Sequence, residues 1–283
     1  MDNEQIQKNV KTGYADIVKR NTKKSFLANV FQCCDPKVMA ADIGKKIGYS
    51  EEELKNVPED ANLGIGCGNP TALASIKKGE TILDLGSGAG FDCFLASGQT
   101  GETGNVIGVD ITPEMVLQAQ KNAEKGNYKN VVFKIGEIEN LPVQSDSIDL
   151  IISNCVINLS NQKERVFEEA FRVAKPGGRI MISDIILLKD LPDYVKNTVE
   201  GHIACLAGAV TKEHYLAAIT KAGFTHIGID KQAPFPIELM LNDPIAQKIV
   251  RENNLTETEI RDIANSIASI SIRAQKPAHE NQL

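Results

Sequence analysis

The chain has 283 residues, and its 31 lysines and arginines against 37 aspartates and glutamates give a formal net charge of −6. That length is enough for one large domain with a buried core. The acidic balance argues against a nucleic-acid partner, because phosphates favour a basic surface. The sequence contains no run of about 18 apolar residues, so it predicts no membrane span. The polar N-terminal sequence lacks the apolar run of a signal peptide. We therefore expect a cytoplasmic protein without a membrane partner, in a compartment where thiols stay reduced.

Residues 1–60 have the pattern of a helical N-terminal extension. The first segment is weakly amphipathic, and Pro36 suits the first turn of a second helix. Ser50 and Glu53 form the capping-box pattern that starts a short helix. The sequence therefore predicts successive helices ahead of the main domain.

From Glu80 onward, short apolar runs alternate with segments in which apolar residues have helical spacing. Runs of this kind predict buried strands, here in TILDLG, NVIGVD, VVFKIG, SIDLIIS, RIMISDIIL, THIGID and IASISIRAQ. Strands that alternate with helices predict an α/β fold with a mostly parallel sheet covered on both faces. We divide the chain into the extension over 1–60, a core over 61–231 with lid helices over 191–223, and a C-terminal cap segment with the last strand over 232–283.

A glycine-rich turn follows the first predicted strand, in the segment DLGSGAG. Glycines there let a ligand approach backbone N–H groups at the start of a helix. We expect Gly86, Ser87 and Gly88 to bind a cofactor, although their spacing is not the G-x-G-x-x-G dinucleotide fingerprint. Asp84, just before the turn, would repel a pyrophosphate but can accept hydrogen bonds from a cationic group. S-adenosylmethionine carries an ammonium and a sulfonium and no phosphate, so the charges favour it over NAD.

Further candidate cofactor residues follow the next three predicted strands. Asp110 ends the second strand, where a carboxylate can accept hydrogen bonds from ribose hydroxyls. Glu137 follows the third strand, where it can bind an adenine amino group, with Ile138 and Met115 flanking the ring. Asn154 ends the fourth strand and is expected to join this site, because open sheets bind ligands at the carboxyl ends of their strands. Asp110 is also a candidate helix N-cap, so a structural role stays open for it.

The six cysteines are too sparse for a disulfide framework and form no C-x-x-C pair. Free cysteines are commonly buried as small apolar residues, and we expect this of Cys93. Cys155 follows the fourth predicted strand, whereas Cys67 lies in a glycine-rich loop before the first strand and Cys205 in the predicted lid. Three thiols that meet beside a methyl donor would suit a soft, thiophilic acceptor. Zinc is the competing ligand, but the histidines lack the paired spacing of a zinc site.

The order of glycines and acids, with the KPGG turn before the fifth strand, resembles that of the class I S-adenosylmethionine-dependent methyltransferases, which have a Rossmann-like fold. The segments around the thiols resemble the arsenite methyltransferases more narrowly. These segments are LGIGCGNP, DLGSGAGFDC, GEIE, SNCVINL and CLAGA. The resemblance covers about residues 65–275, which is most of the chain.

This resemblance implies that arsenic(III), as arsenite or methylarsenite, is held by Cys67, Cys155 and Cys205. S-adenosylmethionine would then methylate it to mono- and dimethyl arsenicals, with trimethylation left open, as a route of arsenic detoxification. The resemblance also implies that an N-terminal cysteine, Cys34 in preference to the adjacent Cys33, forms a disulfide with Cys67. Thioredoxin or glutathione would reduce that disulfide.

Two other functions stay open on the sequence. One is methylation of a small organic acceptor, such as a quinone-ring precursor or a sterol, with His202, His214 and Tyr215 as candidate bases. Fold alone does not exclude this reaction, because function is decided by the site. The other is a non-enzymatic arsenic-binding sensor. The complete set of cofactor residues favours an enzyme, because a thiol trap would not need them.

Overall fold

The computed structural model describes residues 3–22, 36–196, 198, 205–235 and 244–278. Cys33, Cys34 and His202, which the sequence singles out, lie outside the described residues. In the described part of the chain, no helix is both long enough and apolar enough to cross a lipid bilayer.

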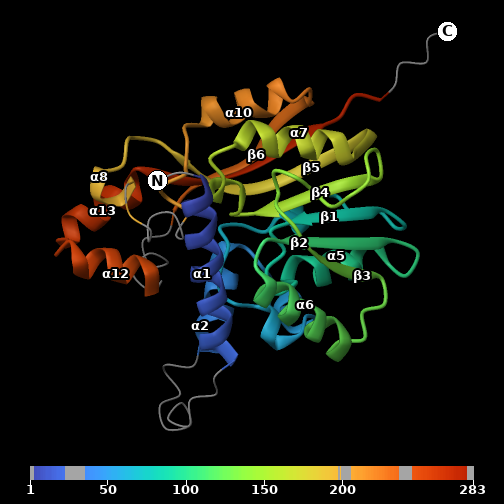
Figure 1. Cartoon of the computed structure of the whole chain (residues 1–283), viewed down its shortest axis with the longest axis horizontal. Helices are drawn as coiled ribbons and strands as arrows, with labels where there is room; N and C mark the ends of the chain where they lie inside the picture. The colour runs from blue at the N-terminus through green and yellow to red at the C-terminus, as the bar shows by residue number, and fades with distance from the viewer. Residues whose placement is uncertain (1–2, 23–35, 197, 199–204, 236–243, 279–283) are drawn as a thin grey trace.

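A seven-stranded sheet forms the centre of the molecule, in the order β3-β2-β1-β4-β5-β7-β6 (Figure 1). Its strands are β1 (Thr81–Leu85), β2 (Asn105–Asp110), β3 (Val131–Ile135), β4 (Ile148–Asn154), β5 (Ala174–Leu187), β6 (Thr225–Pro234) and β7 (Ile267–Gln275). The first five strands pair in parallel, and β7 pairs antiparallel with both β5 and β6. The seven predicted strands are all present, and the predicted mostly parallel Rossmann-like sheet is confirmed.

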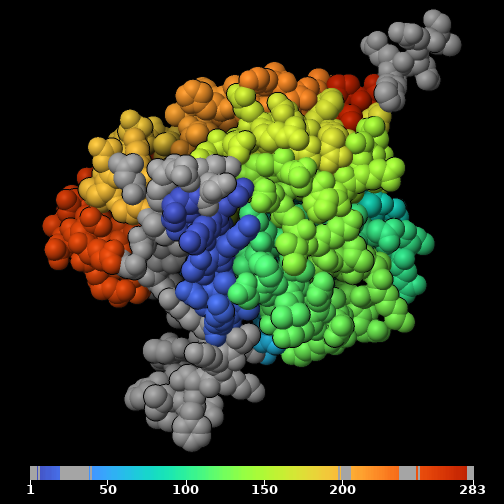
Figure 2. Space-filling model, viewed as in Figure 1, coloured from blue at the N-terminus to red at the C-terminus, as the bar shows by residue number. Residues whose placement is uncertain are grey.

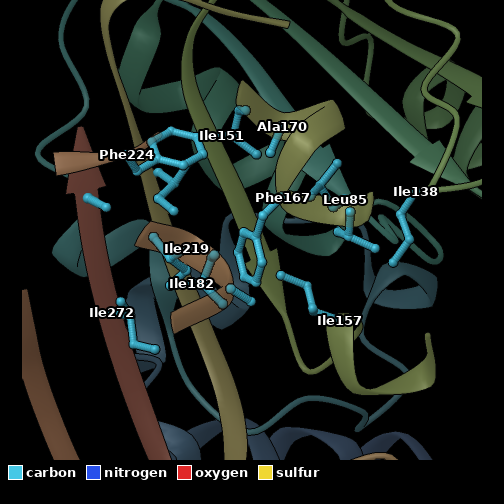
Figure 3. Close-up of a cluster of buried hydrophobic side chains, with 14 of the residues drawn as sticks. Leu85, Ile138, Ile151, Ile157, Phe167, Ala170, Ile182, Ile219, Phe224 and Ile272 are labelled. Atoms are coloured by element: carbon cyan, nitrogen blue, oxygen red, sulfur yellow. The ribbon is translucent and has the colours of Figure 1, made fainter. Parts of the chain in front are cut away.

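Helices cover both faces of the sheet (Figure 1). They are α7 (Lys163–Val173) and α10 (Lys212–Lys221) on one face, and α5 (Phe91–Thr100) and α6 (Pro113–Lys125) on the other. Successive residues of a strand point to opposite faces. Leu85 and Ile151 therefore pack in one cluster with Phe167 of α7 (Figure 3), whereas Ile82 and Leu150 pack in the cluster that includes α5 and α6. This double burial explains why the strands are almost continuously apolar.

The described part of the N-terminal extension forms the helices α1 (Asn3–Thr22), α2 (Pro36–Ile47) and α3 (Glu51–Lys55). The predicted capping box starts α3: Ser50 Oγ accepts the N–H of Glu53 at 3.1 Å, and Glu53 Oε2 accepts the N–H of Ser50 at 2.7 Å. Helix α1 packs against α6 and lies at the surface beside the sheet domain (Figure 2). The helical extension is therefore joined to the core.

A further group of helices lies to one side of the sheet (Figure 1). These are α8 (Asp193–Lys196), α12 (Pro244–Glu252) and α13 (Glu257–Asn265). Short helices elsewhere in the described chain are η2 (Glu59–Ala61), α4 (Pro70–Leu73) and η3 (Ile157–Leu159). Val195 of α8 and Ile263 of α13 share a buried cluster with Cys67 and Cys205. The predicted lid over 191–223 contains α8 and α10, and the division of the chain into three parts stays a prediction.

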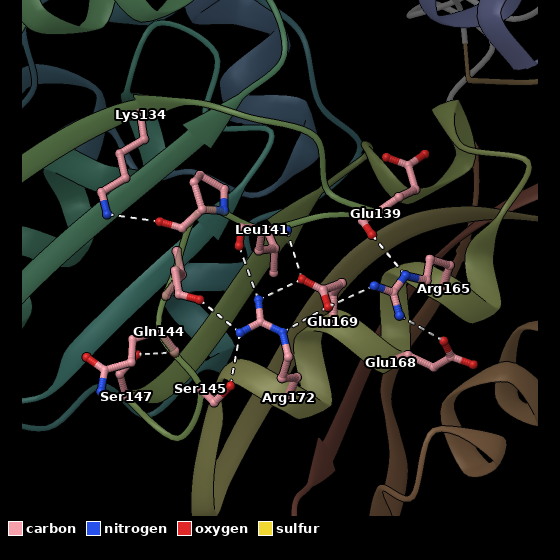
Figure 4. A network of polar contacts seen from close by, with 12 residues as sticks. Lys134, Glu139, Leu141, Gln144, Ser145, Ser147, Arg165, Glu168, Glu169 and Arg172 are labelled. Carbon is pink, nitrogen blue, oxygen red and sulfur yellow. Dashed lines mark hydrogen bonds and ion pairs between the residues drawn. The ribbon is translucent and has the colours of Figure 1, made fainter.

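An ion pair between a buried glutamate and a partly exposed arginine fixes the loop between β3 and β4 (Figure 4). Glu169 of α7 is 3% exposed, and its Oε2 accepts hydrogen bonds from Arg172 Nη2 at 2.7 Å and from the N–H of Leu141 at 2.9 Å. Arg172 also donates to the carbonyl oxygens of Leu141 and Val143. The hydrogen bond from Arg172 holds the pKa of Glu169 below its usual value. Because this loop carries Ile138, the ion pair helps to position one wall of the cavity described below.

Ile151 of β4 has no exposed surface, whereas Ile135 at the end of the edge strand β3 is 58% exposed. Ile151→Ala removes core packing and leaves a cavity, so we expect the free energy of unfolding to fall by about 2–5 kcal/mol. The matched control Ile135→Ala should change it by less than about 0.5 kcal/mol. Urea unfolding followed by circular dichroism measures both values, and equal losses would contradict the placement of Ile151 in the core.

Candidate active site

A cavity of about 210 Å³ lies at the carboxyl ends of β1, β2 and β4. The sheet order reverses between β1 and β4, and open α/β sheets bind ligands in the crevice at such a point. Helix α1 contributes Val10 and Tyr14 to the wall, and the loop before β1 contributes Ile65 and Gly66. The N-terminal extension therefore forms part of the site.

The turn after β1 brings the backbone to the cavity. Gly86 and Gly88 have φ angles of 68° and 52°, in the left-handed region that strains residues with a side chain. A Cβ atom on Gly86 would also overlap the side chain of Val156. The N–H groups of Gly86 and Ser87 donate to the carbonyl oxygen of Val109 at 2.8 and 3.0 Å. The predicted residues Gly86, Ser87 and Gly88 all line the cavity, in a turn held against β2.

Two buried carboxylates, Asp84 and Asp92, line the same cavity. Cys93 Sγ donates to Asp84 Oδ2 at 3.2 Å, and the hydroxyl of Tyr49 donates to Asp92 Oδ1 at 2.6 Å. Burial, followed by the neighbouring Asp92, raises the pKa of Asp84 well above its ordinary value. Burial also raises the pKa of Asp92 to about 6. Because both anions are destabilised by burial, a cationic ligand group would be favoured here. Cys93 is fully buried, as predicted.

Asp110, at the end of β2, is fixed by backbone hydrogen bonds. Its Oδ2 accepts the N–H of Gly88 at 2.9 Å, and its Oδ1 accepts the N–H of Thr112 at 2.8 Å. Thr112, rather than Asp110, is the N-cap residue of α6. A carboxylate has about four lone pairs, more than these hydrogen bonds and that from the Thr112 side chain use, and Asp110 lines the cavity. Asp110 can therefore accept hydrogen bonds from ligand hydroxyls while it holds the glycine turn.

Two of the predicted cofactor residues do not line the cavity. Met115, in the first turn of α6, is fully buried, because it packs beneath Gly88, whose Cβ position would be 3.9 Å from its Sδ. Glu137 lies in a turn whose backbone bridges to Asn140. Ile138, which the sequence predicts to flank the adenine ring together with Met115, does line the cavity.

The side chain of Asn154 connects the two ends of the site. Its Nδ2 lies within hydrogen-bonding distance of the Tyr49 hydroxyl at 2.9 Å, the Gly68 carbonyl at 2.8 Å and Asp92 Oδ2 at 3.1 Å. Its Oδ1 accepts the N–H of Cys67 at 3.0 Å. Asn154, which the sequence predicts to bind the cofactor, thus holds the loop that carries Cys67.

The three thiols predicted from separate segments meet next to this junction. The Sγ atoms of Cys67 and Cys155 and a carboxylate oxygen of Asp184 all lie within 4.8 Å of one another. Cys205 Sγ donates to the carbonyl oxygen of Cys155 at 2.9 Å, and the two side chains are also hydrogen-bonded. Cys155 and Cys205 line the cavity, and Cys67 is buried beside them.

The backbone at two of the thiols is strained. Cys155 and Cys205 each have a φ of 59°, a conformation that costs a residue with a side chain about 1–2 kcal/mol. Strain of this kind is found mainly at functional sites, where the surrounding structure maintains it. At Cys155 it is maintained in part by a 2.8 Å hydrogen bond from its N–H to the carbonyl oxygen of Ser183.

The environment keeps all three thiols protonated. Burial raises the pKa of Cys67. The pKa of Cys205 is raised well above its ordinary value by its hydrogen bond with Cys155 and then by burial. At Cys155 the hydrogen bond with Cys205 lowers the pKa, but the hydrogen bond with Cys67 and burial outweigh it, so the pKa is again raised well above the ordinary value.

Sequence reasoning missed two polar groups at the thiol end. The hydroxyl of Tyr14 in α1 lies 3.8 Å from Cys205 Sγ, and no feature of the sequence indicated this contact. Asp184 is fully buried in β5. An isolated carboxylate within the apolar run RIMISDIIL is a signal that could have identified it.

The candidate bases for an organic acceptor are poorly placed. His214 is exposed and contacts Thr211. Tyr215 is fully buried and its hydroxyl donates to Asp184 Oδ2 at 2.9 Å. Neither residue lines the cavity, so the described residues do not favour this alternative.

Comparisons with known proteins agree with this geometry. A family model described as a methyltransferase domain matches residues 76–223. The chain is 32% identical to CrArsM, an arsenic(III) S-adenosylmethionine methyltransferase from Chlamydomonas reinhardtii, with a TM-score of 0.60 over 88% of this chain and 76% of that one. The chain belongs to the arsenite methyltransferase family.

Two further arsenite methyltransferases are similar over much of the chain. That of Halobacterium salinarum is 40% identical over 252 residues, which are 88% of this chain and 60% of that protein. The human enzyme is 35% identical over 230 residues, which are 78% of this chain and 58% of that protein. The chain therefore spans about 60% of the length of these curated members of the family.

Because the raised pKa values keep Cys155 and Cys205 as thiols, we expect iodoacetamide to alkylate them slowly in the folded protein at pH 8. Their rates should rise steeply above pH 9, whereas in guanidinium chloride the same cysteines should titrate near the ordinary pKa of about 8.5. Peptide mass spectrometry measures the rate at each cysteine. Folded-state rates that already level off below pH 8.5 would contradict the environment described for these thiols.

Proposed function

We propose that the chain transfers methyl groups from S-adenosylmethionine to trivalent arsenic bound by Cys67, Cys155 and Cys205, and that it detoxifies arsenic in this way. Arsenite and methylarsenite are the proposed substrates, and mono- and dimethyl arsenicals the products. The observation that carries the proposal is the meeting of three thiols beside a cavity that also contains the glycine turn and the buried acids.

The residues around the glycine turn fit the methyl donor. Asp84 and Asp92 offer carboxylates to its ammonium group, Asp110 offers a free lone pair to its ribose hydroxyls, and Ile138 offers an apolar surface to its adenine. The absence of a Cβ at Gly86 lets the turn pack closely against Val156. When bound, S-adenosylmethionine supplies an electrophilic methyl group on a sulfonium.

The thiols fit trivalent arsenic, a soft acceptor that prefers sulfur ligands. Each buried thiol can displace one hydroxyl of arsenous acid: an As–S bond forms, the As–O bond breaks, and the thiol proton leaves with the hydroxyl as water. This exchange starts from a neutral thiol and a neutral acid, so the raised pKa values of these cysteines are compatible with it. The bound arsenic is neutral and keeps its lone pair.

Methylation of that lone pair removes no proton, so the reaction needs no general base. The chain would contribute by positioning the acceptor and excluding water. Asn154 links the Cys67 loop to the acids of the donor end, and Tyr14 of α1 contacts Cys205 at the cavity wall. These contacts support a site that holds the acceptor thiols in a defined position.

The proposal extends to the regeneration of trivalent arsenic. Methylation formally oxidises arsenic from the trivalent to the pentavalent state, so a reductant is needed between successive transfers. By resemblance, Cys34 would form a disulfide with Cys67 and supply the electrons, and thioredoxin or glutathione in the cytosol would reduce that disulfide. Cys34 lies outside the described residues.

Wild-type protein incubated with arsenite, S-adenosylmethionine and a thiol should yield methylated arsenic, detected by chromatography with elemental detection. Cys155→Ser should abolish these products, because oxygen is a poor ligand for a soft acceptor. S-adenosylmethionine binding by calorimetry serves as the control, and it should survive this substitution. Methylation of methylarsenite by the variant would count decisively against the assignment of Cys155.

Gly86→Ala should weaken S-adenosylmethionine binding more than tenfold, because the new Cβ would overlap Val156 and distort the turn. Gly177→Ala is a matched control, since Gly177 also has a positive φ, of 80°, but no heavy atom lies within 4 Å of its Cβ position. Gly177→Ala should lose about 1 kcal/mol of stability from backbone strain, and Gly86→Ala should lose more because of the overlap with Val156. Calorimetric titration with S-adenosylmethionine measures the affinity of each variant. Equal affinities in the two variants would argue against a donor site at this turn.

A further inference from the structure

Asp184 is a buried carboxylate beside Cys67 and Cys155, and the reaction proposed above gives it no role. It lies in β5 with no exposed surface, and one of its carboxylate oxygens is within 4.8 Å of the Sγ atoms of Cys67 and Cys155. Burying an ionisable group is costly unless hydrogen bonds or an opposite charge offset it. Its position beside the thiols therefore calls for an explanation.

The surroundings of Asp184 support its ionised form. Its Oδ1 accepts the Nδ2–H of Asn158 at 2.9 Å and the N–H of Ile185 at 2.8 Å. Its Oδ2 accepts the hydroxyl of Tyr215 at 2.9 Å, and the ammonium of Lys163 also favours the anion. Burial is the largest effect and raises its pKa to about 6. Above neutral pH the carboxylate is therefore negatively charged.

This charge has little to act on while arsenic is merely bound. Arsenic(III) held by thiolates is neutral, as is the complex in which one ligand is still a hydroxyl. A carboxylate therefore gains little electrostatic attraction from the bound substrate. The charge distribution changes only during transfer, when the arsenic lone pair forms the As–C bond and the sulfonium S–C bond breaks. The electron pair of the broken bond stays on the donor sulfur, which becomes a neutral thioether, and the positive charge passes to arsenic.

We propose that Asp184 stabilises the positive charge that arsenic acquires during methyl transfer, and that Lys163 opposes this effect. The proposal rests on the proposed function. An interaction that exists only in the transition state accelerates the chemical step without tightening substrate binding, and fixed charges in a water-excluded site are effective in this role. Asp184 should therefore govern the transfer rate and leave arsenite affinity almost unchanged.

The test compares Asp184→Asn with wild type at pH 8.5. Arsenite affinity is measured by equilibrium dialysis without the methyl donor, and the transfer rate by single turnover at saturating S-adenosylmethionine. We expect the affinity to stay within about twofold and the rate to fall on the order of 100-fold. Asp149→Asn is the matched control, because Asp149 is an aspartate of β4 that pairs with Lys175 and lies outside the cavity. It removes the same formal charge and should leave the rate unchanged.

Lys163→Met provides a second variant with the opposite expected sign. The ammonium of Lys163 interacts with Asp184 and Cys205, so its removal strengthens the negative field at arsenic. We expect the transfer rate to rise by about two- to fivefold. This variant also keeps the proposal testable if Asp184→Asn does not fold, and a lower rate in folded Lys163→Met would overturn it.

The outcomes separate the two proposals. A wild-type protein that binds S-adenosylmethionine but does not methylate arsenic would overturn the proposed function, and the inference about Asp184 with it. A wild-type protein that methylates arsenic, together with an Asp184→Asn variant that transfers at the wild-type rate, would overturn the inference alone. Loss of arsenite affinity in folded Asp184→Asn would also overturn it, because Asp184 would then act in binding the acceptor.

Discussion

The hydrogen bonds of the Asn154 amide join the two halves of the site, and the remaining arrangement depends on them. The Nδ2 side reaches Asp92 and Tyr49 near the glycine turn, and the Oδ1 side holds the backbone of Cys67. Gly66 is part of the same constraint, because a Cβ there would lie 3.1 Å from Asn154 Nδ2. Group transfer between two bound reactants is sensitive to their separation. A side chain that connects the two proposed reactant sites is therefore well placed to set this separation.

Acidic side chains dominate the charge of the cavity. Asp84, Asp92 and Asp110 line it, and Asp184 lies behind the thiols. Burial raises the pKa of each of these carboxyls. A cationic reactant lowers the cost of ionising buried acids. The same surroundings keep the free thiols neutral. The proposed acceptor complex is also uncharged until the methyl group arrives, because three thiolates balance the charge of arsenic(III). The site therefore suits a reaction in which one positive charge moves from donor to acceptor.

Much of this arrangement could be predicted from the sequence, because it depends on local patterns. The strands, the capping box at Ser50 and the glycine turn each follow from a few adjacent residues. The place of Cys155 could be predicted because strand ends of a parallel sheet meet at one edge. The convergence of Cys67 and Cys205 on it was implied by the resemblance of their segments to a known family. Met115 was placed against a ligand, but the helix turns its side chain into the core beneath Gly88.

Contacts between segments that are far apart in the sequence could not be predicted from local patterns. Tyr14 and Cys205 are 191 positions apart, and the weak amphipathic pattern of α1 does not indicate which distant residue its inner face contacts. Asp184 was read as part of an apolar strand, and its partner Tyr215 was read as a possible base. Only the packing of α10 against β5 brings these two side chains together. Positions of this kind follow from tertiary packing and not from local pattern.

The left-handed backbone at Cys155 and Cys205 has a consequence for how these positions can change. Glycine would adopt a φ of 59° without steric penalty, so at both sites the residue that suits the fold best has no sulfur. Drift toward greater stability would therefore tend to erase the reactive groups, leaving a well-folded nucleoside-binding shell that is inert toward metalloids. Cysteine at these two positions is therefore explained by the chemistry proposed for them and not by the backbone conformation.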